Sequence, residues 1–211
     1  MSILIKVKNS FFQNIKAIIF LQLLSIIILI LYYSNKDFNI LLNQLKFIKE
    51  KYGILAVMIT TSISGGIFPE ILNKIFKKNY IVLPKRLLLI SLFWLYKGFE
   101  INLFYTFLSK IVNTNNIVYN VIIKVAIDEF LYTPLWAVPS MIFYYSLSEK
   151  LSLNYFFESL KANYLLILIL NWLIWIPAVS LIYSLPLALQ MPIQNIILVI
   201  WTILILFFNK S

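Results

Sequence analysis

The residues of this chain that could carry chemistry lie close together in residues 124–139, with the sequence KVAIDEFLYTPLWAVP. Lys124, Asp128 and Glu129 stand there in apolar surroundings, where charged side chains are costly and usually functional. The chain contains no cysteine and no histidine, which excludes thiolate chemistry, imidazole catalysis and the usual zinc and haem ligands. No phosphate loop, metal-ligand spacing or nucleophile motif accompanies the carboxylates. The sequence therefore favours a protein that is not an enzyme and needs no cofactor.

The composition indicates a protein that lives in a lipid bilayer. Of the 211 residues, 62% are hydrophobic and 12% are charged, against roughly 25% charged in soluble domains. The net charge of +10 comes from basic residues that lie mostly between apolar runs. That placement is typical of topology signals and lipid-headgroup contacts rather than of nucleic-acid binding. We expect one transmembrane domain over residues 1–211, because about 20 apolar residues suffice for each crossing.

The hydropathy pattern predicts an all-α polytopic membrane bundle of about six transmembrane helices. The expected spans are residues 17–33, 54–68, 87–108, 117–147, 164–185 and 193–208, and amphipathic surface helices are expected over residues 38–53 and 148–161. The span over residues 54–68 is rich in Ser, Thr and Gly and is predicted to end at Pro69. Its small residues favour a helix-packing face over a pore lining.

Prolines are predicted to kink the fourth and fifth spans. Residues 117–147 are too many for a straight helix across a ~30 Å hydrocarbon core. Pro134 and Pro139 are the expected kink points, and in an α-helix they would free the carbonyls of Phe130 and Leu135. The fifth span contains Pro177, and it also contains Asn171, which either bonds to a neighbouring helix or contacts solute.

The distribution of basic residues predicts the orientation of the chain. With six spans, the loops on the side of the two termini hold more lysine and arginine than those on the other side, which places both termini in the cytoplasm. The basic N-terminus precedes an apolar run without a small-residue cleavage site, so a retained anchor is expected. We expect a bacterial inner membrane, with an organelle membrane as the alternative.

The charged residues of two spans predict a buried polar network. Lys124 and Asp128, four residues apart, share a helix face and are expected to pair, while Glu129 points about 100° away. A carboxylate in hydrocarbon costs several kcal/mol unless it is paired or wet, so Glu129 needs a partner such as Lys97. The expected network between the third and fourth spans comprises Lys97, Glu100, Lys124, Asp128 and Glu129.

Two alternatives to this network stay open. Lys97 and Glu100, three residues apart, could neutralise one another as a structural pair. Residues 124–129 could instead lie at the membrane interface, with the span starting near Phe130. Because Gly98 and Tyr105 share one polar face of the third span and Glu100 lies opposite, we expect that span inside the bundle.

A second set of residues follows a recognisable order along residues 85–208. It consists of Arg86, Gly98, Tyr105, Pro134, Trp172, Trp175, Pro177, Pro186 and Trp201, together with Lys124-Val-Ala-Ile-Asp128-Glu129. This set resembles the peroxisomal membrane protein of twenty-two kilodaltons family. The resemblance implies a small multi-helix protein of organelle or peroxisomal membranes that forms a weakly selective channel for small metabolites, with roles linked to nucleotide supply and redox balance.

Three positions depart from the family pattern. The family usually has glutamine where this chain has Glu129 and proline where it has Phe99, and its amino-terminal Gly-Asp motif is reduced to Ser64-Gly65-Gly66. We expect a channel-like protein for small metabolites or ions, with a homo-oligomer, small solutes and the lipid bilayer as partners. The alternative is a scaffolding membrane protein whose buried charges only lock its helices together.

Overall fold

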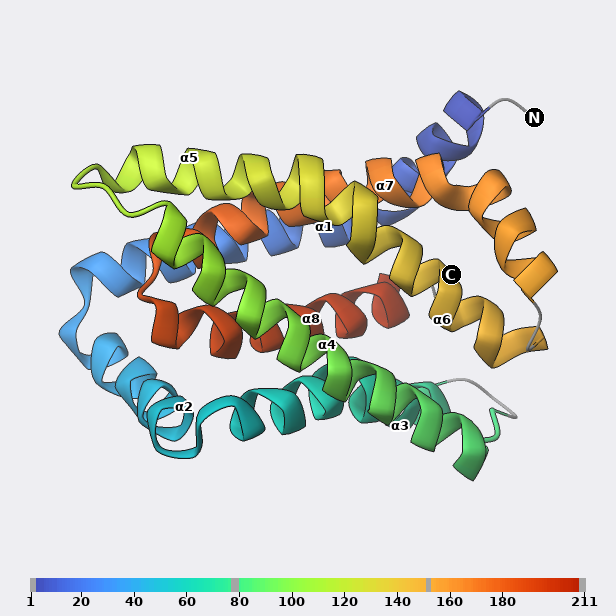
Figure 1. Ribbon diagram of the computed structural model, residues 1–211, viewed down its shortest axis with the longest axis horizontal. Coiled ribbons are helices and arrows are strands. Elements are labelled where there is room, and N and C mark those ends of the chain that lie inside the picture. The colour runs from blue at the N-terminus through green and yellow to red at the C-terminus, as the bar shows by residue number, and fades with distance from the viewer. Residues whose placement is uncertain (1–2, 77–79, 151–152, 209–211) are drawn as a thin grey trace.

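The structure is a computed structural model that describes residues 3–76, 80–150 and 153–208, and these residues form helices and no strands. In chain order the elements are α1 (Ile3–Ser34), α2 (Lys36–Ser62), the π-helix η1 (Ile63–Ile67), α3 (Phe68–Phe76), α4 (Pro84–Ile111), α5 (Ile117–Ile127), the π-helix η2 (Asp128–Ala137), α6 (Val138–Lys150), α7 (Leu153–Ser184) and α8 (Leu187–Phe208). Most of them run along the long axis of the molecule (Figure 1). The prediction of an all-α chain is confirmed for the described residues.

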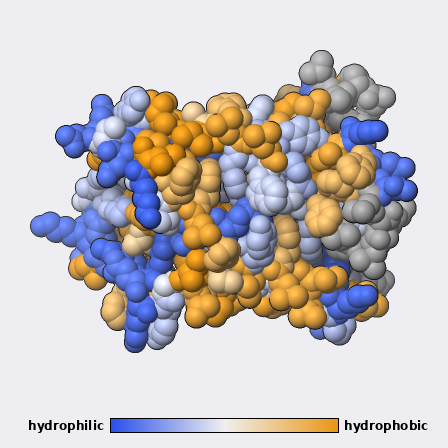
Figure 2. Space-filling model, viewed as in Figure 1, coloured by the Kyte–Doolittle hydropathy of each residue, from blue (hydrophilic) through white to orange (hydrophobic). Residues whose placement is uncertain are grey.

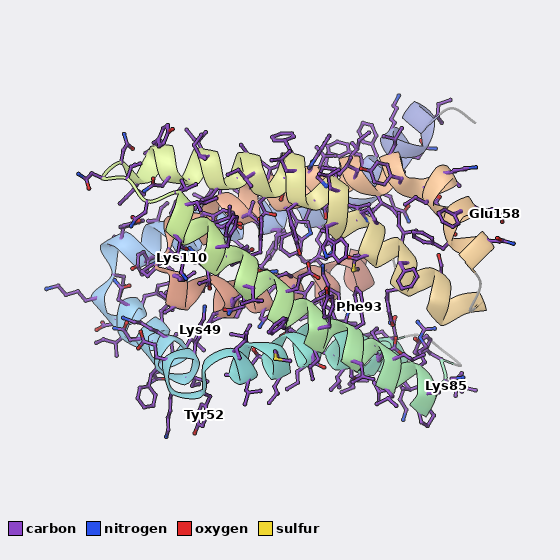
Figure 3. The ribbon with its side chains drawn as sticks, viewed as in Figure 1. Lys49, Tyr52, Lys85, Phe93, Lys110 and Glu158 are labelled. Carbon is purple, nitrogen blue, oxygen red and sulfur yellow. The ribbon has the colours of Figure 1, made fainter. Side chains whose placement is uncertain are left out.

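Five helical stretches of the described chain are long and apolar enough to cross a membrane. They are Phe11–Ser34, Lys36–Phe76, Pro84–Ile111, Asn154–Ser184 and Leu187–Leu204. An apolar band occupies the middle of the visible face and hydrophilic residues gather towards the two ends (Figure 2). Figure 3 places Lys49 and Lys110 at one end and Lys85 and Glu158 at the other. The distribution of hydrophobic and charged side chains is therefore that of a membrane protein.

Helix α8 supplies much of the hydrophobic core. Leu189, Met191, Ile193 and Ile197 are all 2% exposed or less and belong to one cluster with residues of α1, α2, α4, α5 and α7. The helix begins directly after Pro186, earlier than the predicted start at residue 193. Proline before a helix leaves no amide donor to satisfy, which suits this boundary. The earlier start brings Gln190, which the sequence assigned to a loop, into the helix.

The predicted surface helix and second span form one helix with a bend. The Asn35 side chain caps α2 by accepting from the Phe38 amide, and Gly53 lies inside the helix with φ of 59°, outside helical geometry. Glycine adopts this left-handed conformation without the steric cost that a Cβ would add. The two halves of α2 thus meet at an angle at Gly53, with the exposed Tyr52 beside it.

The prediction that Pro69 ends the second span is wrong. The chain continues through η1 into α3, which reaches Phe76. The Phe68 amide donates to the carbonyl of Ile63, five residues back, so the α-helical ladder is already interrupted before the proline. Pro69 then occupies the first turn of α3, where a missing amide donor costs little.

Small residues bring α2, η1 and α4 close together. A Cβ on Gly98 would lie 2.9 Å from Thr61 Cβ and 3.0 Å from Met58 Cα, and a Cβ on Gly65 would run into the Trp94 ring. Asn195 of α8 bonds to both Thr60 and Thr61 of α2. This contact confirms the prediction that the Ser, Thr and Gly residues form a packing face.

Helix α4 lies at the surface of the molecule, contrary to the prediction of an interior helix. Leu88, Leu92, Leu103 and Phe107 are each about half exposed along one side, while Gly98 is buried on the other. The prediction was wrong because Glu100 does not need the interior: it pairs with a lysine one turn away on its own helix. A peripheral α4 presents one polar stripe to its neighbours and one apolar stripe outwards.

The predicted surface helix over residues 148–161 is not a separate element. Helix α6 extends to Lys150 and α7 begins at Leu153, while residues 151–152 lie outside the described part. Phe156 of α7 packs edge-on against Phe143 of α6, with ring centroids 5.5 Å apart. This aromatic contact holds the first turns of α7 against α6 instead of leaving them on a surface.

Candidate functional site

The site forms around η2, the π-helical stretch between α5 and α6. In a π-helix an amide donates to the carbonyl five residues back, and at Val138 this acceptor is Thr133. Pro134 and Pro139 lack amides, so in this geometry the carbonyls left without a helical donor are those of Glu129 and Pro134. Trp172 Nε1 donates to the Glu129 carbonyl at 2.7 Å, and the Tyr164 hydroxyl donates to the Pro134 carbonyl at 2.9 Å.

This finding corrects the prediction that Phe130 and Leu135 have free carbonyls. The expected positions assumed an α-helix, and the π-helical register moves each of them back by one residue. Two α7 side chains therefore recognise η2 at the carbonyls its prolines leave open. The hydrogen bonds from Trp172 and Tyr164 thus connect α7 to η2 at two points.

Two consecutive carboxylates of η2 face the interior. Asp128 and Glu129 are 5% and 1% exposed, and Thr133 of the same helix is 4% exposed. They border a cavity of about 140 Å³ between α4, η2, α7 and α8. Its charged and polar lining residues are Lys97, Asp128, Glu129, Thr133, Asn171 and Gln194, and Trp94, Tyr105, Tyr132 and Trp175 supply aromatic walls.

The charge of Lys97 is neutralised on its own helix. Its Nζ lies 2.8 Å from Glu100 Oε1, and it also contacts the Tyr132 hydroxyl and Ser140 Oγ at 3.3 Å each. Tyr132 donates to Glu100 in turn and stacks on Phe104. The predicted alternative of a Lys97–Glu100 pair is therefore realised, and Lys97 of this pair lines the cavity.

The predicted pair between Lys124 and Asp128 is wrong. Asp128 Oδ2 accepts a 2.6 Å hydrogen bond from the Tyr183 hydroxyl, and no lysine or arginine of the described residues pairs with it. Lys124 borders a second cavity, of about 360 Å³, beside Tyr33 and Ser184 at the ends of α1 and α7. A neutral hydroxyl donor satisfies a buried carboxylate without the cost of burying a second charge. The alternative that residues 124–129 lie at the membrane interface stays open.

Glu129 also lacks its predicted partner Lys97, because that lysine is occupied by Glu100. Asn171 of α7 lines the central cavity together with Glu129, and its two predicted roles, bonding to a neighbouring helix or contacting solute, both stay open. Glu129 Oε2 and Gln194 Oε1 are buried and make no hydrogen bond within the described residues. Two acceptor atoms of residues that line the cavity, one from η2 and one from α8, are thus without donors among the described residues.

A third cavity continues from the first towards the other end of the molecule. It measures about 410 Å³ and shares Ala137, Met141 and Asn171 with the central cavity. Its remaining polar lining residues, Ser146, Ser159 and Asn163 among them, belong to the end of α6 and the start of α7. The cavity beside Lys124 shares no lining residue with the central cavity, and the Tyr183–Asp128 hydrogen bond joins a residue of one lining to a residue of the other.

The sequence interpretation missed Gln190, Gln194 and Asn195, which are 2%, 8% and 5% exposed. All three lie on α8: Gln190 precedes the predicted start of that helix at residue 193, and Gln194 and Asn195 follow it. The signal that could have found them is Pro186, which marks a helix start and places two glutamines four residues apart on one face.

A third buried acid, Glu70, escaped the sequence interpretation. It is 2% exposed, accepts from the Tyr80 hydroxyl at 2.8 Å and lies 3.4 Å from Arg86 Nη2. Burial, followed by the Glu70 contact, raises the pKa of Tyr80, so the phenol stays protonated as a donor. This cluster connects α3 to the start of α4. It contains Arg86, one of the residues on which the family resemblance rests.

The other family-like residues take packing or lining positions. Gly98 lies against α2, Trp172 donates to a carbonyl of η2, and Trp201 packs against the main core. Tyr105 and Trp175 line the central cavity. Of the prolines, Pro134 lies within η2, Pro177 lies inside α7, and Pro186 lies between α7 and α8.

Comparison of the chain with known proteins gives no relative: no family model, no curated protein and no solved structure matches it.

Proposed function

We propose that this chain is a polytopic membrane protein that lets small solutes pass along the row of three cavities. The observation that carries the proposal is the central cavity, which is lined by Asp128 and Glu129 with no basic partner for either carboxylate. Lys97 lines the same cavity but is paired with Glu100, and buried carboxylates without an ion pair of their own are costly inside a membrane protein and are retained where water or solute reaches them. A purely structural helix contact would be better served by apolar side chains of the same size.

The size of the cavity limits what could pass. A volume of about 140 Å³ holds a handful of water molecules at ~30 Å³ each. Ions and very small polar metabolites fit such a space, and nucleotides do not fit without a wider state. The unpartnered oxygens of Glu129 and Gln194 offer acceptors to a solute that donates hydrogen bonds or carries positive charge.

The proposed topology has six crossings within one domain. The five apolar helical stretches account for five crossings, and α5, η2 and α6 together make the sixth, with both termini on the more basic, cytoplasmic side. Pro134, Pro139 and Pro177 are proposed to kink the fourth and fifth crossings. The bacterial inner membrane stays our preferred location, and the resemblance to the peroxisomal membrane protein of twenty-two kilodaltons family supports a channel-like role.

A scaffolding role is the second candidate. It is favoured by the Lys97–Glu100–Tyr132 cluster, which is internally paired, and by the close Gly98 contact that locks α4 onto α2. On this alternative the protein would bind other subunits through its exposed apolar faces and would conduct nothing.

Reconstitution separates the two candidates. Purified protein in planar bilayers or ion-loaded liposomes should conduct above the lipid background, and Ala137→Phe, which fills the junction of two cavities, should lower that conductance. The control is Val118→Phe, which places the same side chain on α5 at a residue that is 67% exposed and lines neither of these cavities. A tight bilayer across voltage and pH, or equal conductance of both variants, would support the scaffold instead.

A further inference from the structure

Outside the proposed path, an apolar groove lies in the corner between the two halves of α2 and the side of α8. It has a volume of about 310 Å³ and is walled by Leu45, Val57, Ile196, Val199 and Ile200. The corner exists because Gly53, with its positive φ, turns the amphipathic first half of α2 away from the second half. The groove therefore connects one end of the molecule with its apolar middle.

A single charged residue, Lys49, stands among the residues that line this groove. Its Nζ donates a 2.8 Å hydrogen bond to the carbonyl of Leu187, the first residue of α8. An ammonium group has three donors, so this bond leaves two of them for another acceptor. The lysine is thus held in place at the groove with donor capacity remaining.

Beyond Lys49 the groove has three polar lining residues, Thr60, Ser64 and Asn195, and two of them, Thr60 and Asn195, are already engaged. Thr60 Oγ1 donates to the Ala56 carbonyl and accepts from Asn195 Nδ2, while Asn195 Oδ1 accepts from Thr61. Because these groups satisfy each other, the inner groove offers little to a polar ligand. A ligand that fits has an anionic group at Lys49 and a hydrocarbon chain beyond it.

The charge around the groove mouth agrees with an anionic headgroup. The first half of α2 carries Lys46, Lys49 and Lys51 close to the bend, against Glu50, and Figure 3 places Lys49 and Lys110 at the same end of the molecule. Glu50 is engaged by Lys46 at 3.7 Å. On the proposed topology this end lies opposite the termini, so the headgroup belongs to the outer leaflet. The ammonium groups there attract an anionic headgroup, and a choline group would meet unfavourable like charge.

We infer that the groove is a binding site for an anionic phospholipid, with its phosphate on Lys49 and an acyl chain between α2 and α8. This site is separate from the cavity row and does not depend on solute passage. A second surface groove, of about 490 Å³ beside Ser25, Val118 and Pro177, contains no charged lining residue and gives no reason to prefer one headgroup over another.

The test is native mass spectrometry of the full chain in detergent with phosphatidylglycerol or phosphatidylcholine added. Wild-type protein should retain phosphatidylglycerol in preference to phosphatidylcholine, and Lys49→Gln should weaken phosphatidylglycerol binding about fivefold, as expected for one lysine at an anionic surface. The matched control is Lys51→Gln on the same helix, whose ammonium lies over the Phe47 and Tyr52 rings rather than in the groove. That control should bind like wild type.

A variant that keeps the charge completes the design. Ala56→Leu fills the groove without touching Lys49, and it should lose phosphatidylglycerol while its helix content and monodispersity stay normal. Equal retention of phosphatidylcholine and phosphatidylglycerol by wild type would overturn the inference. Equal losses in Lys49→Gln and Lys51→Gln, or undiminished binding by Ala56→Leu, would overturn it as well.

Discussion

The Tyr183 hydroxyl donates a 2.6 Å hydrogen bond to Asp128 Oδ2, and this bond lies between two of the three cavities. Tyr183 lines the cavity near Lys124, while Asp128 lines the central one. The Tyr183 ring is held edge-on against Tyr105, with centroids 5.0 Å apart. The pair therefore both satisfies a buried acid and separates the two spaces.

Removing this hydroxyl should have two effects that can be measured separately. Tyr183→Phe leaves Asp128 without its donor, which we expect to cost about 1–3 kcal/mol of stability by thermal unfolding in detergent. It should also raise solute flux in liposomes, because the barrier between the cavities loses its bond. Tyr164→Phe is the control, since it removes a hydroxyl that bonds a backbone carbonyl and lines neither cavity. Equal flux in both variants would show that the Tyr183 bond is structural only.

The two adjacent acids should respond in opposite directions to neutralisation. Glu129→Gln replaces a buried oxygen that has no donor with an amide donor, in a cavity where Gln194 Oε1 lacks one, so it should raise stability by about 1–3 kcal/mol. Asp128→Asn adds two N–H donors beside a bond that needs only an acceptor, so it should lower stability. Cation flux should fall most in Glu129→Gln. If both variants match wild type in unfolding and in flux, the polar cavity has no role.

The contact between α2 and α4 should be intolerant of a single methyl group. Gly98→Ala would bring a Cβ to 3.0 Å from the Met58 Cα, a backbone atom that cannot turn aside, so the helices must separate. We expect a loss of about 1–3 kcal/mol, typical of overpacking. Leu103→Ala on the exposed side of α4 is the control and should change the unfolding temperature little. An unchanged Gly98→Ala protein would show that the two helices are not in close contact.

The Glu70 cluster should couple two residues in a double-mutant cycle. Arg86→Ala leaves the buried Glu70 with Tyr80 as its donor and should cost about 1–2 kcal/mol, limited because Arg86 is itself 45% exposed. The same change in a Glu70→Gln background should cost clearly less. Thermal unfolding of the four proteins measures the coupling, and additive losses would mean that the contact contributes nothing.

The sequence by itself determined the class of structure. Long apolar runs separated by basic loops can form only helices in lipid, since every backbone donor and acceptor must then be satisfied within its own segment. It also determined where polar groups interrupt those runs, and therefore that Asp128, Glu129, Lys97 and Asn171 would matter. These conclusions rest on local composition and spacing, which need no knowledge of which helices are neighbours.

The tertiary structure alone decided which of these groups meet. Tyr183, 55 residues away in sequence, takes the place at Asp128 that the nearby Lys124 was expected to hold. The π-helical register of η2 moves the open carbonyls by one residue, and Trp172 and Tyr164 find them there. Partners across helices depend on how helices are rotated and packed together, and spacing within one helix does not contain that information.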